Sequence, residues 1–291
     1  MKKIFIPLIS LLMPFVAAFG HEDGICAGSA ALTFSDNKAE ININTPLMDF
    51  KKGKKITVNT TVTDPMKKTV AKKSDTYKFI PGLSACQNIT IDSLILWSPE
   101  TPVFYTAFTE VSVKGKAVDS CRYTFAMRSA RLSDNGCIEL NGYYRIPKGV
   151  LMNNIPSITK TDMAELHRRL VSIKSFGADM IRLPYGKPDD ILLEICDELG
   201  LMVMVEPEFA ESLQRHPSVV GISSANGIPG KWIDDFTDRN SLIPSDILDK
   251  IRKQWNAAGK PVPVKDPVKT LPPAEIQIHE EKIPGHLRYQ E

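Results

Sequence analysis

The sequence DDILLEICDELGLMVMVE, residues 189–206, decides the fold of the second half of the chain. Its apolar residues recur three and four positions apart from Ile191 to Leu199, which predicts an amphipathic helix that ends at Gly200. The apolar run 201–205 follows that glycine directly and predicts a buried strand. A helix that leads straight into an apolar strand is typical of parallel sheets with right-handed helical crossovers. This stretch therefore predicts an α/β domain.

The same alternation continues on both sides of this stretch. An N-cap at Thr161 followed by apolar residues at helical spacing predicts a helix that ends at Gly177. Further elements are predicted as strands at 180–183 and 219–223, a helical turn at 210–215, and a last helix from Ser245 to Gly259. We therefore expect parallel strands, as a piece of an α/β barrel or of a doubly wound sheet.

A different period governs the chain from Ala30 to about residue 140. Apolar and polar residues alternate along 56–63 and again along 121–128. Further strand-like runs are predicted near 30–34, 75–80, 86–91 and 102–113. A period of two puts one face of a strand in a core and the other face in water. About seven short strands, separated by glycine-containing turns and without a long helical pattern, predict an antiparallel sandwich of immunoglobulin type.

The N-terminus has the pattern of a secretory signal. Lys2 and Lys3 precede an apolar run over 4–19, and small residues end the segment at Ala18 and Gly20. We expect cleavage before His21 and a periplasmic or secreted protein. Cleavage would remove two of the 36 basic residues and leave 34 against 34 acidic residues. No later stretch has the ~18 consecutive apolar residues of a membrane span.

Charge and cysteine usage exclude several classes of function. The near balance of basic and acidic residues argues against a nucleic-acid-binding protein. The five cysteines include no C-x-x-C pair, so we expect no metal site, and we expect no cofactor. One or two disulfides are possible in an oxidising compartment, and an odd count leaves at least one thiol.

Several ordered segments resemble one enzyme family. They are LWSPETPVFY at 96–105, the Asn141-Gly142 turn, KGV at 148–150, the segment from Thr161 to Arg182, CDELGLMVMVE at 196–206 and HPSVV at 216–220. Together they resemble glycoside hydrolase family 2, which comprises β-galactosidases, β-glucuronidases and β-mannosidases. The resemblance covers about residues 30–227 and implies a sandwich followed by a TIM barrel that hydrolyses β-linked glycosides with retention. It makes KGV the first strand of that barrel, so four parallel strands are expected together with those at 180–183, 201–205 and 219–223.

The resemblance also implies a pair of carboxylates, one a proton donor and the other a nucleophile. The family's acid/base is the Glu of an Asn-Glu pair after the fourth strand. Here that pair reads Asn226-Gly227, and a glycine carries no proton. The 151 residues from Asn141 onward are also fewer than the about 250 of a typical barrel. We therefore expect a shortened barrel in a pseudoenzyme.

The expected fold class is multidomain, with an immunoglobulin-like β-sandwich followed by a partial TIM-barrel-like domain. The predicted division is a signal peptide at 1–20, the sandwich at 21–138, the shortened barrel-like domain at 139–259 and a proline-rich tail at 260–291.

Five residues are candidates for the site. Glu206 and Glu208 follow a strand at the end where barrels place functional groups, and they are the candidate catalytic pair. Asn226, Arg182 and Trp232 are the candidate residues for binding a β-linked glycan. A structural alternative pairs Glu206 with Arg182, because the two strands that precede them should be neighbours.

Three functions remain open. The first is carbohydrate binding with lost or reduced hydrolysis. The second is an active β-glycosidase whose site is rebuilt from Glu206 and Glu208, or from an acid of the tail such as Glu275. The third is a non-catalytic interaction module, because the open edges of a four-stranded sheet must be covered by the tail, the sandwich or a second copy of the chain.

Other conspicuous residues have structural interpretations. His216 before Pro217 is expected to anchor a loop, and the aromatic residues Trp97, Phe104 and Tyr105 are expected to pack in a core or between domains. Lysines gather in the first half of the sandwich, at Lys51, Lys52, Lys54, Lys55, Lys67, Lys68, Lys72 and Lys73. Such runs usually form solvated hairpin ends, with contact to an acidic polysaccharide or a membrane surface as the alternative.

Overall fold

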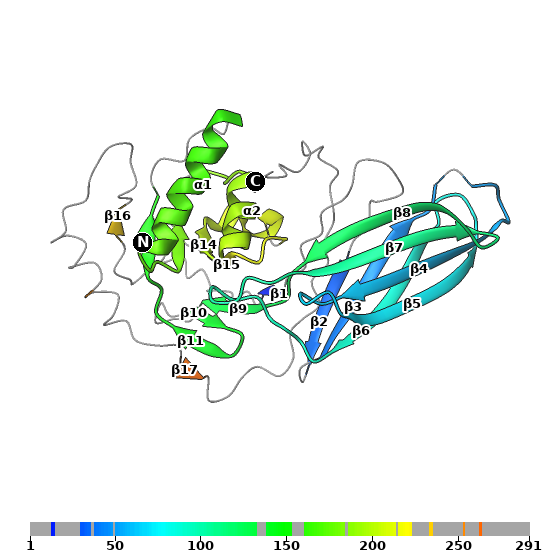
Figure 1. The fold of residues 1–291 in the computed structure, drawn as a ribbon, viewed down its shortest axis with the longest axis horizontal. Coiled ribbons are helices and arrows are strands. Elements are labelled where there is room, and N and C mark those ends of the chain that lie inside the picture. The colour runs from blue at the N-terminus through cyan, green and yellow to red at the C-terminus, as the bar shows by residue number, and fades with distance from the viewer. Residues whose placement is uncertain are drawn as a thin grey trace, which may run out of the picture.

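The computed structural model contains a β-sandwich and an α/β unit, joined by a small antiparallel sheet (Figure 1). It describes residues 13–14, 30–35, 38–48, 50–132, 138–152, 160–183, 186–213, 215–222, 233–234, 253 and 262–263. The predicted signal cleavage site, the helix at 245–259 apart from residue 253, and most of the tail lie outside these residues, as do Asn226, Gly227 and Trp232.

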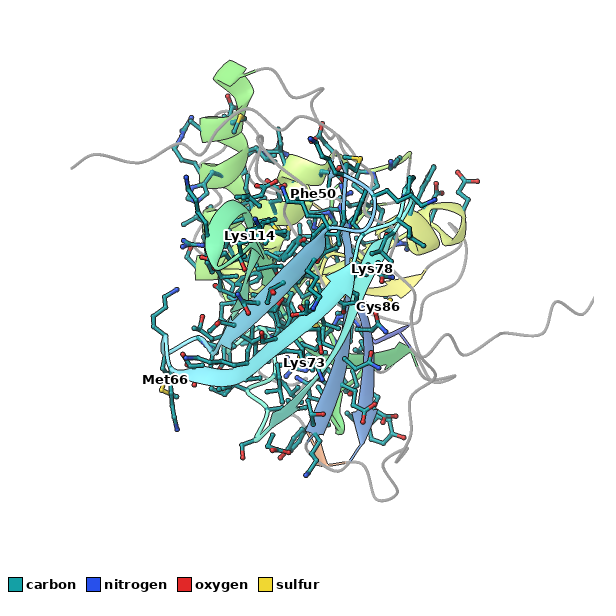
Figure 2. The ribbon with its side chains drawn as sticks, turned by 90° about the vertical axis from the view of Figure 1, so that its right-hand side faces the viewer. Phe50, Met66, Lys73, Lys78, Cys86 and Lys114 are labelled. Carbon is teal, nitrogen blue, oxygen red and sulfur yellow. The ribbon has the colours of Figure 1, made fainter. Side chains whose placement is uncertain are left out.

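The sandwich consists of two antiparallel sheets. Within the described part, one sheet has the order β2-β3-β6 and the other β5-β4-β7-β8. The strands are β2 (Ala30–Ser35), β3 (Lys38–Pro46), β4 (Lys55–Thr63), β5 (Thr69–Lys78), β6 (Ser84–Asp92), β7 (Tyr105–Val113) and β8 (Lys116–Phe125). Figure 2 shows this end of the molecule, with Lys73 and Lys78 of β5 labelled. The architecture is the immunoglobulin-like one that the period of two predicts.

Alternating side chains build the core between these sheets. Ile41 and Ile43 of β3, Val62 of β4, and Ile89 of β6 are all buried there. Tyr105 stacks on another core ring and its hydroxyl accepts a hydrogen bond from the backbone N–H of Ile95, 2.8 Å away. A tyrosine at the start of this strand that bonds back to the preceding connection is typical of immunoglobulin-like sandwiches.

One buried polar group links the two sheets. The Gln87 side chain of β6 accepts a hydrogen bond from Thr60 of β4 at 2.6 Å and donates to the Val58 carbonyl at 3.1 Å. Thr60 is also 2.8 Å from the Thr109 hydroxyl of β7. Buried polar groups are costly unless they are paired, so this network fixes how the two sheets face each other.

The α/β unit contains a parallel sheet with the order β15-β14-β13-β12-β16 among the described residues. Its strands are β12 (Gly149–Leu151), β13 (Met180–Arg182), β14 (Met202–Val205), β15 (Val219–Ile222) and β16 (Ile233–Asp234). The crossovers hold α1 (Lys160–Ser175), α2 (Asp190–Leu199), the one-turn helix α3 (Pro207–Ala210) and the 3-10 turn η1 (Glu211–Leu213).

Local signals set the ends of α2. The carboxylate of Asp189 accepts a hydrogen bond from the Ile191 N–H at 2.9 Å, which caps the first turn. Gly200 ends the helix in the left-handed conformation at φ 69°, and its N–H bonds to the Cys196 carbonyl. A Cβ on Gly200 would also lie 2.6 Å from the Pro99 carbonyl oxygen, so both the backbone and the neighbouring loop require glycine.

The parallel sheet has a different core on each face. Ile181, Val203 and Val219 pack against the helices α1 and α2. On the other face lie Met180, Met202, Met204 and Val220, together with Trp97, Ala126, Ala130, Ile138 and Leu140. Three of these, Ala130, Ile138 and Leu140, belong to the connecting sheet, whose described order is β1 (Met13–Pro14), β9 (Ser129–Leu132), β10 (Ile138–Leu140), β11 (Tyr143–Arg145) and β17 (Val262–Pro263).

The LWSPET loop between β6 and β7 joins the sandwich to the α/β unit. Trp97 is fully buried and its indole N–H donates to the Asp197 carbonyl of α2 at 2.9 Å. Lys174 of α1 donates to the carbonyls of Pro99 and Gly200, each at 2.8 Å. Glu100 accepts a bidentate pair of 3.1 Å bonds from Arg145 of β11. The expectation that the aromatic residues of this segment pack in a core or between domains is confirmed.

Several predicted bounds need correction. The parallel sheet has five described strands where four were predicted, because β16 pairs with β12. Helix α1 begins at Lys160, before the predicted N-cap Thr161. The predicted strand at 75–80 is instead β5 at Thr69–Lys78, and the predicted helical turn at 210–215 is instead α3 and η1 over 207–213. The physical reason is that tertiary pairing, which local pattern does not report, sets these ends.

Candidate functional site

The carboxyl edge of the parallel sheet brings two predicted site residues onto neighbouring strands. Arg182 is the last residue of β13, and Glu206 follows directly after β14. β13 and β14 are parallel and in register, with Arg182 opposite Met204. Both side chains are partly buried. The strands lie about 4.8 Å apart, so the two residues occupy adjacent positions on one edge.

The alternation of the strands indicates which face these residues occupy. Arg182 is two positions after Met180, and Glu206 is two positions after Met204. Because residues two apart on a strand share a face, both follow the methionine face of the sheet rather than the helix face. In a closed barrel this would be the interior face, at the end where functional groups gather.

Glu208 does not join this pair. Glu208 is exposed on the one-turn helix α3, whereas Glu206, with which it was predicted to pair, lies before that helix. The backbone of Asp234, a position that sequence reasoning did not single out, ends β16 at the same edge of the sheet. Three strand spacings, or about 14 Å, separate β14 from β16 across β13 and β12. Retaining hydrolysis needs carboxyls about 5–5.5 Å apart.

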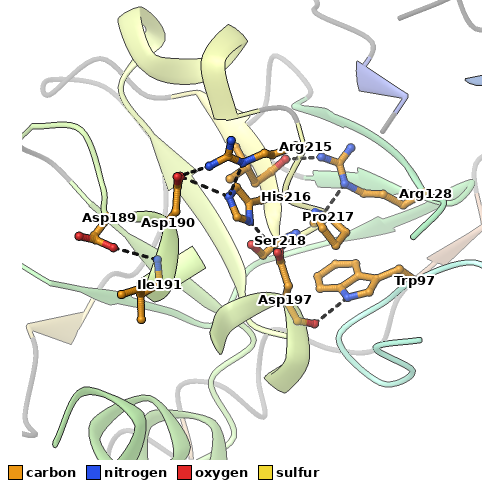
Figure 3. A network of polar contacts seen from close by, with 11 residues as sticks. Trp97, Arg128, Asp189, Asp190, Ile191, Asp197, Arg215, His216, Pro217 and Ser218 are labelled. Atoms are coloured by element: carbon orange, nitrogen blue, oxygen red, sulfur yellow. Dashed lines mark hydrogen bonds and ion pairs between the residues drawn. The ribbon is translucent and has the colours of Figure 1, made fainter. Parts of the chain in front are cut away.

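A second polar cluster surrounds His216, in the turn before β15 (Figure 3). His216 is fully buried, with its Nδ1 2.7 Å from the Asp197 carboxylate and its Nε2 3.5 Å from the Asp190 carboxylate. Asp197 also accepts the Ser218 N–H at 2.9 Å. Arg215 pairs with Asp190 from the outer side. The expected loop-anchoring role of His216 fits this geometry.

Charge stabilises the protonated form of this histidine. Burial lowers the pKa of His216, but Asp197 and Asp190 together outweigh burial and raise it above its usual value. In return, the hydrogen bond from His216 is the main cause that lowers the pKa of Asp190 to about 2. Glu194 lies on the same helix, and its burial, with Asp190 and Asp197 nearby, raises its pKa to about 7.

The sandwich reaches into this cluster through Arg128. Its guanidinium is fully buried, and its Nε donates to the Pro217 carbonyl at 2.7 Å while a terminal nitrogen donates to the Val219 carbonyl. Burial lowers the pKa of Arg128 to about 9, against the opposing effect of Asp197. The guanidinium is therefore charged at neutral pH. The turn 215–218 is thus bonded to Asp197 of α2 on one side and to Arg128, just after the last sandwich strand, on the other.

Comparison with known proteins connects these features to one family. Residues 30–128 match the family model described as glycosyl hydrolases family 2. The β-galactosidase BoGH2A of Bacteroides ovatus is 23% identical over 246 residues, which is 73% of this chain and 29% of that protein. These matches support an assignment to glycosyl hydrolase family 2, whose family model covers the sandwich at residues 30–128.

Solved structures share the fold of this chain. A family 2 glycosyl hydrolase from Bacteroides cellulosilyticus aligns with a TM-score of 0.55 at 17% identity, covering 86% of this chain and 35% of the other. A Bacteroides uniformis β-glucuronidase aligns with a TM-score of 0.53 at 19% identity, covering 79% of this chain and 30% of the other. The chain spans less than a third of the length of BoGH2A.

The described part of the chain shows neither a metal-binding cluster nor a membrane-spanning helix. No group of three or more His, Cys, Asp or Glu residues there is arranged to hold a metal ion. Within the same residues, no helix has the length and apolar character to cross a membrane.

Cys86, Cys121 and Cys196 are free thiols, and Cys26 and Cys137 lie outside the described residues.

Proposed function

We propose that this chain is exported and binds a β-linked glycan at the carboxyl edge of its parallel sheet, with hydrolysis lost or greatly reduced. Its similarity to a family of β-glycosidases supports a carbohydrate ligand. The order β15-β14-β13-β12 has the parallel pairing of successive barrel strands, which supports a partial TIM-barrel-like domain. In such a domain the ligand meets the carboxyl ends of the strands.

The single observation that carries the loss of hydrolysis is Gly227. The family resemblance puts the proton-donating Glu at this position, after the strand β15 and next to Asn226. General acid catalysis contributes about 10²–10⁴-fold to such reactions, and glycine supplies no proton. Sugar hydroxyls need only hydrogen-bonding groups, which the guanidinium of Arg182 and the amide of Asn226 provide.

The rival activity is hydrolysis through a rebuilt carboxylate pair. Glu206 supports it, because this side chain lies at the functional edge of the sheet. The exposed position of Glu208 on α3 and the about 14 Å between β14 and β16 both count against a matched partner. A Glu206→Gln variant separates the two functions, because it would abolish hydrolysis that depends on this carboxylate.

The test measures turnover and binding on the same protein. Aryl β-galactoside, β-glucuronide and β-mannoside should show no turnover near ordinary enzyme rates of about 1–10³ s⁻¹. The corresponding oligosaccharides should bind in calorimetry, and Asn226→Ala or Arg182→Ala should weaken that binding about ten-fold or more. Arg168→Ala, which removes the same charge from an exposed position on α1, is the matched control. Ordinary turnover, or binding unchanged by both site variants, would overturn the proposal.

A further inference from the structure

The end of the sandwich that faces away from the α/β unit has an unusual surface. Three connections meet there, because β4 and β8 begin and β5 and β7 end at this side. The opposite ends of β7 and β8 lead to Trp97 and Arg128 at the domain interface. We call residues 47–55, 78–83 and 113–117 the distal tip. Figure 2 shows one labelled residue from each of its segments, Phe50, Lys78 and Lys114.

Backbone hydrogen bonds hold two of these segments together. The Leu47 N–H donates to the Leu83 carbonyl at 2.9 Å, and the Gly53 N–H donates to the Phe79 carbonyl at 2.8 Å. The rings of Phe50 and Phe79 pack edge to face with centroids 5.7 Å apart. The segments 47–55 and 78–83 are therefore fixed against each other rather than being independent loops.

The tip is strongly cationic. Its three segments contain seven lysines and one acidic residue, Asp49. The seven lysines are all exposed, and they are Lys51, Lys52, Lys54, Lys55, Lys78, Lys114 and Lys116. The whole chain has a net charge of +2, so the tip is a local concentration of positive charge. Such a concentration attracts a polyanionic partner, and the attraction weakens as salt is added.

Exposed apolar side chains at the tip distinguish between anionic partners. Met48 is 57% exposed and Ile80 is 52% exposed, on the two segments that are bonded to each other. Exposed aliphatic side chains gain nothing from an acidic polysaccharide in water. At a bilayer they enter the boundary between headgroups and acyl chains, while lysine stems extend to the phosphates.

We infer that the distal tip docks the protein on the surface of an anionic phospholipid bilayer. Met48 and Ile80 enter the boundary region, and the surrounding lysines face the lipid phosphates. The α/β unit, with the carboxyl edge of its sheet, is then held at the far end of the sandwich from the bilayer. This inference does not depend on the proposed glycan binding, because it uses residues of the sandwich alone.

Vesicle sedimentation tests the docking. The full chain should bind vesicles of phosphatidylglycerol and phosphatidylcholine, and bind pure phosphatidylcholine vesicles at least ten-fold more weakly. The triple variant Lys51→Glu, Lys52→Glu and Lys54→Glu should lose ten-fold or more of the binding. The matched control Lys68→Glu, Lys72→Glu and Lys73→Glu makes the same charge change on exposed residues near the other end of the β4–β5 hairpin and should bind nearly as the parent does. Both variants keep the same apolar N-terminus, so a difference between them comes from the tip.

A second variant identifies the partner. The double variant Met48→Ser and Ile80→Ser keeps every lysine and should weaken vesicle binding several-fold. The bilayer proposal would be overturned if the parent protein did not bind vesicles and this variant still bound alginate, an acidic polysaccharide. Equal losses in the tip and control triple variants would also overturn it. Circular dichroism of each variant establishes that the sandwich is folded in the comparison.

Discussion

The partly buried carboxyl of Glu194 provides a prediction whose size depends on pH. Its pKa is raised to about 7 from 4.5, mainly because of burial, with Asp190 and Asp197 adding repulsion and His216 and Arg215 opposing it. The folded state thus favours the protonated acid. Folding therefore becomes costlier as pH rises from 4.5 to 7, and the full cost is present above pH 7.

The size of this cost follows from the two pKa values. A gap of 2.5 pH units between the folded and unfolded states corresponds to about 3.4 kcal/mol. The side chain is only partly buried, so water screens part of this cost and about 1–2 kcal/mol is a better expectation. Glu194→Gln keeps the shape of the protonated acid and cannot ionise. It should therefore stabilise the protein by about 1–2 kcal/mol at pH 8 and by almost nothing at pH 4.5.

Urea denaturation of both proteins at pH 4.5 and pH 8 measures this difference. Glu198→Gln, an exposed substitution on the same helix, should change the free energy of unfolding by less than about 0.5 kcal/mol at either pH. A gain of the same size at both pH values would refute the reasoning, because it would come from helix propensity or packing rather than from ionisation. Destabilisation at pH 8 would refute it as well.

Three further substitutions probe the polar cluster and the interface. Asp197→Asn should lower the pKa of His216, because it removes the main charge that opposes burial, and an unchanged NMR titration of His216 would contradict this. Gly200→Ala should cost more than about 2 kcal/mol in urea denaturation, because φ is 69° and the new Cβ would meet the Pro99 carbonyl at 2.6 Å; a neutral effect would show that the loop can move away. Trp97→Phe should cost about 1–3 kcal/mol, because it leaves the buried Asp197 carbonyl without its indole donor, and a thermal melt within 1 °C of the parent would argue against this.

Elements with local signals were predictable from the sequence. The ends of α2 are set by the carboxylate of Asp189 and by Gly200, and both signals lie within the helix and its flanking residues. The sandwich strands with strict alternation, such as β4 and β6, were predicted close to their actual ends. β5 was predicted too short because its edge position exposes a run of polar residues over 72–76 that hides the alternation.

Features made by distant contacts were not predictable. The strands β9, β10 and β11 are three or four residues long, too short for a period to show, and their pairing with each other defines them. The spacing of Asp190 and Asp197 puts both on one face of α2, which the sequence does show. Nothing local indicates that His216, some 20 residues later, inserts between them. The predicted glycan-binding residues Asn226 and Trp232 remain predictions.

The buried position of Arg128 has a consequence for how such proteins can be recombined. The family-model match ends at this residue, yet its side chain contacts the backbone on either side of Ser218 in the following unit. A cut at residue 128 would therefore divide a shared core, leaving the methionine face of the parallel sheet without Trp97 and Ala126. Exchange of a sandwich between relatives would succeed only if the LWSPET loop and its receiving surface on α1 and α2 were inherited together. The sandwich alone therefore cannot be exchanged between relatives, because its interface with the α/β unit must be exchanged with it.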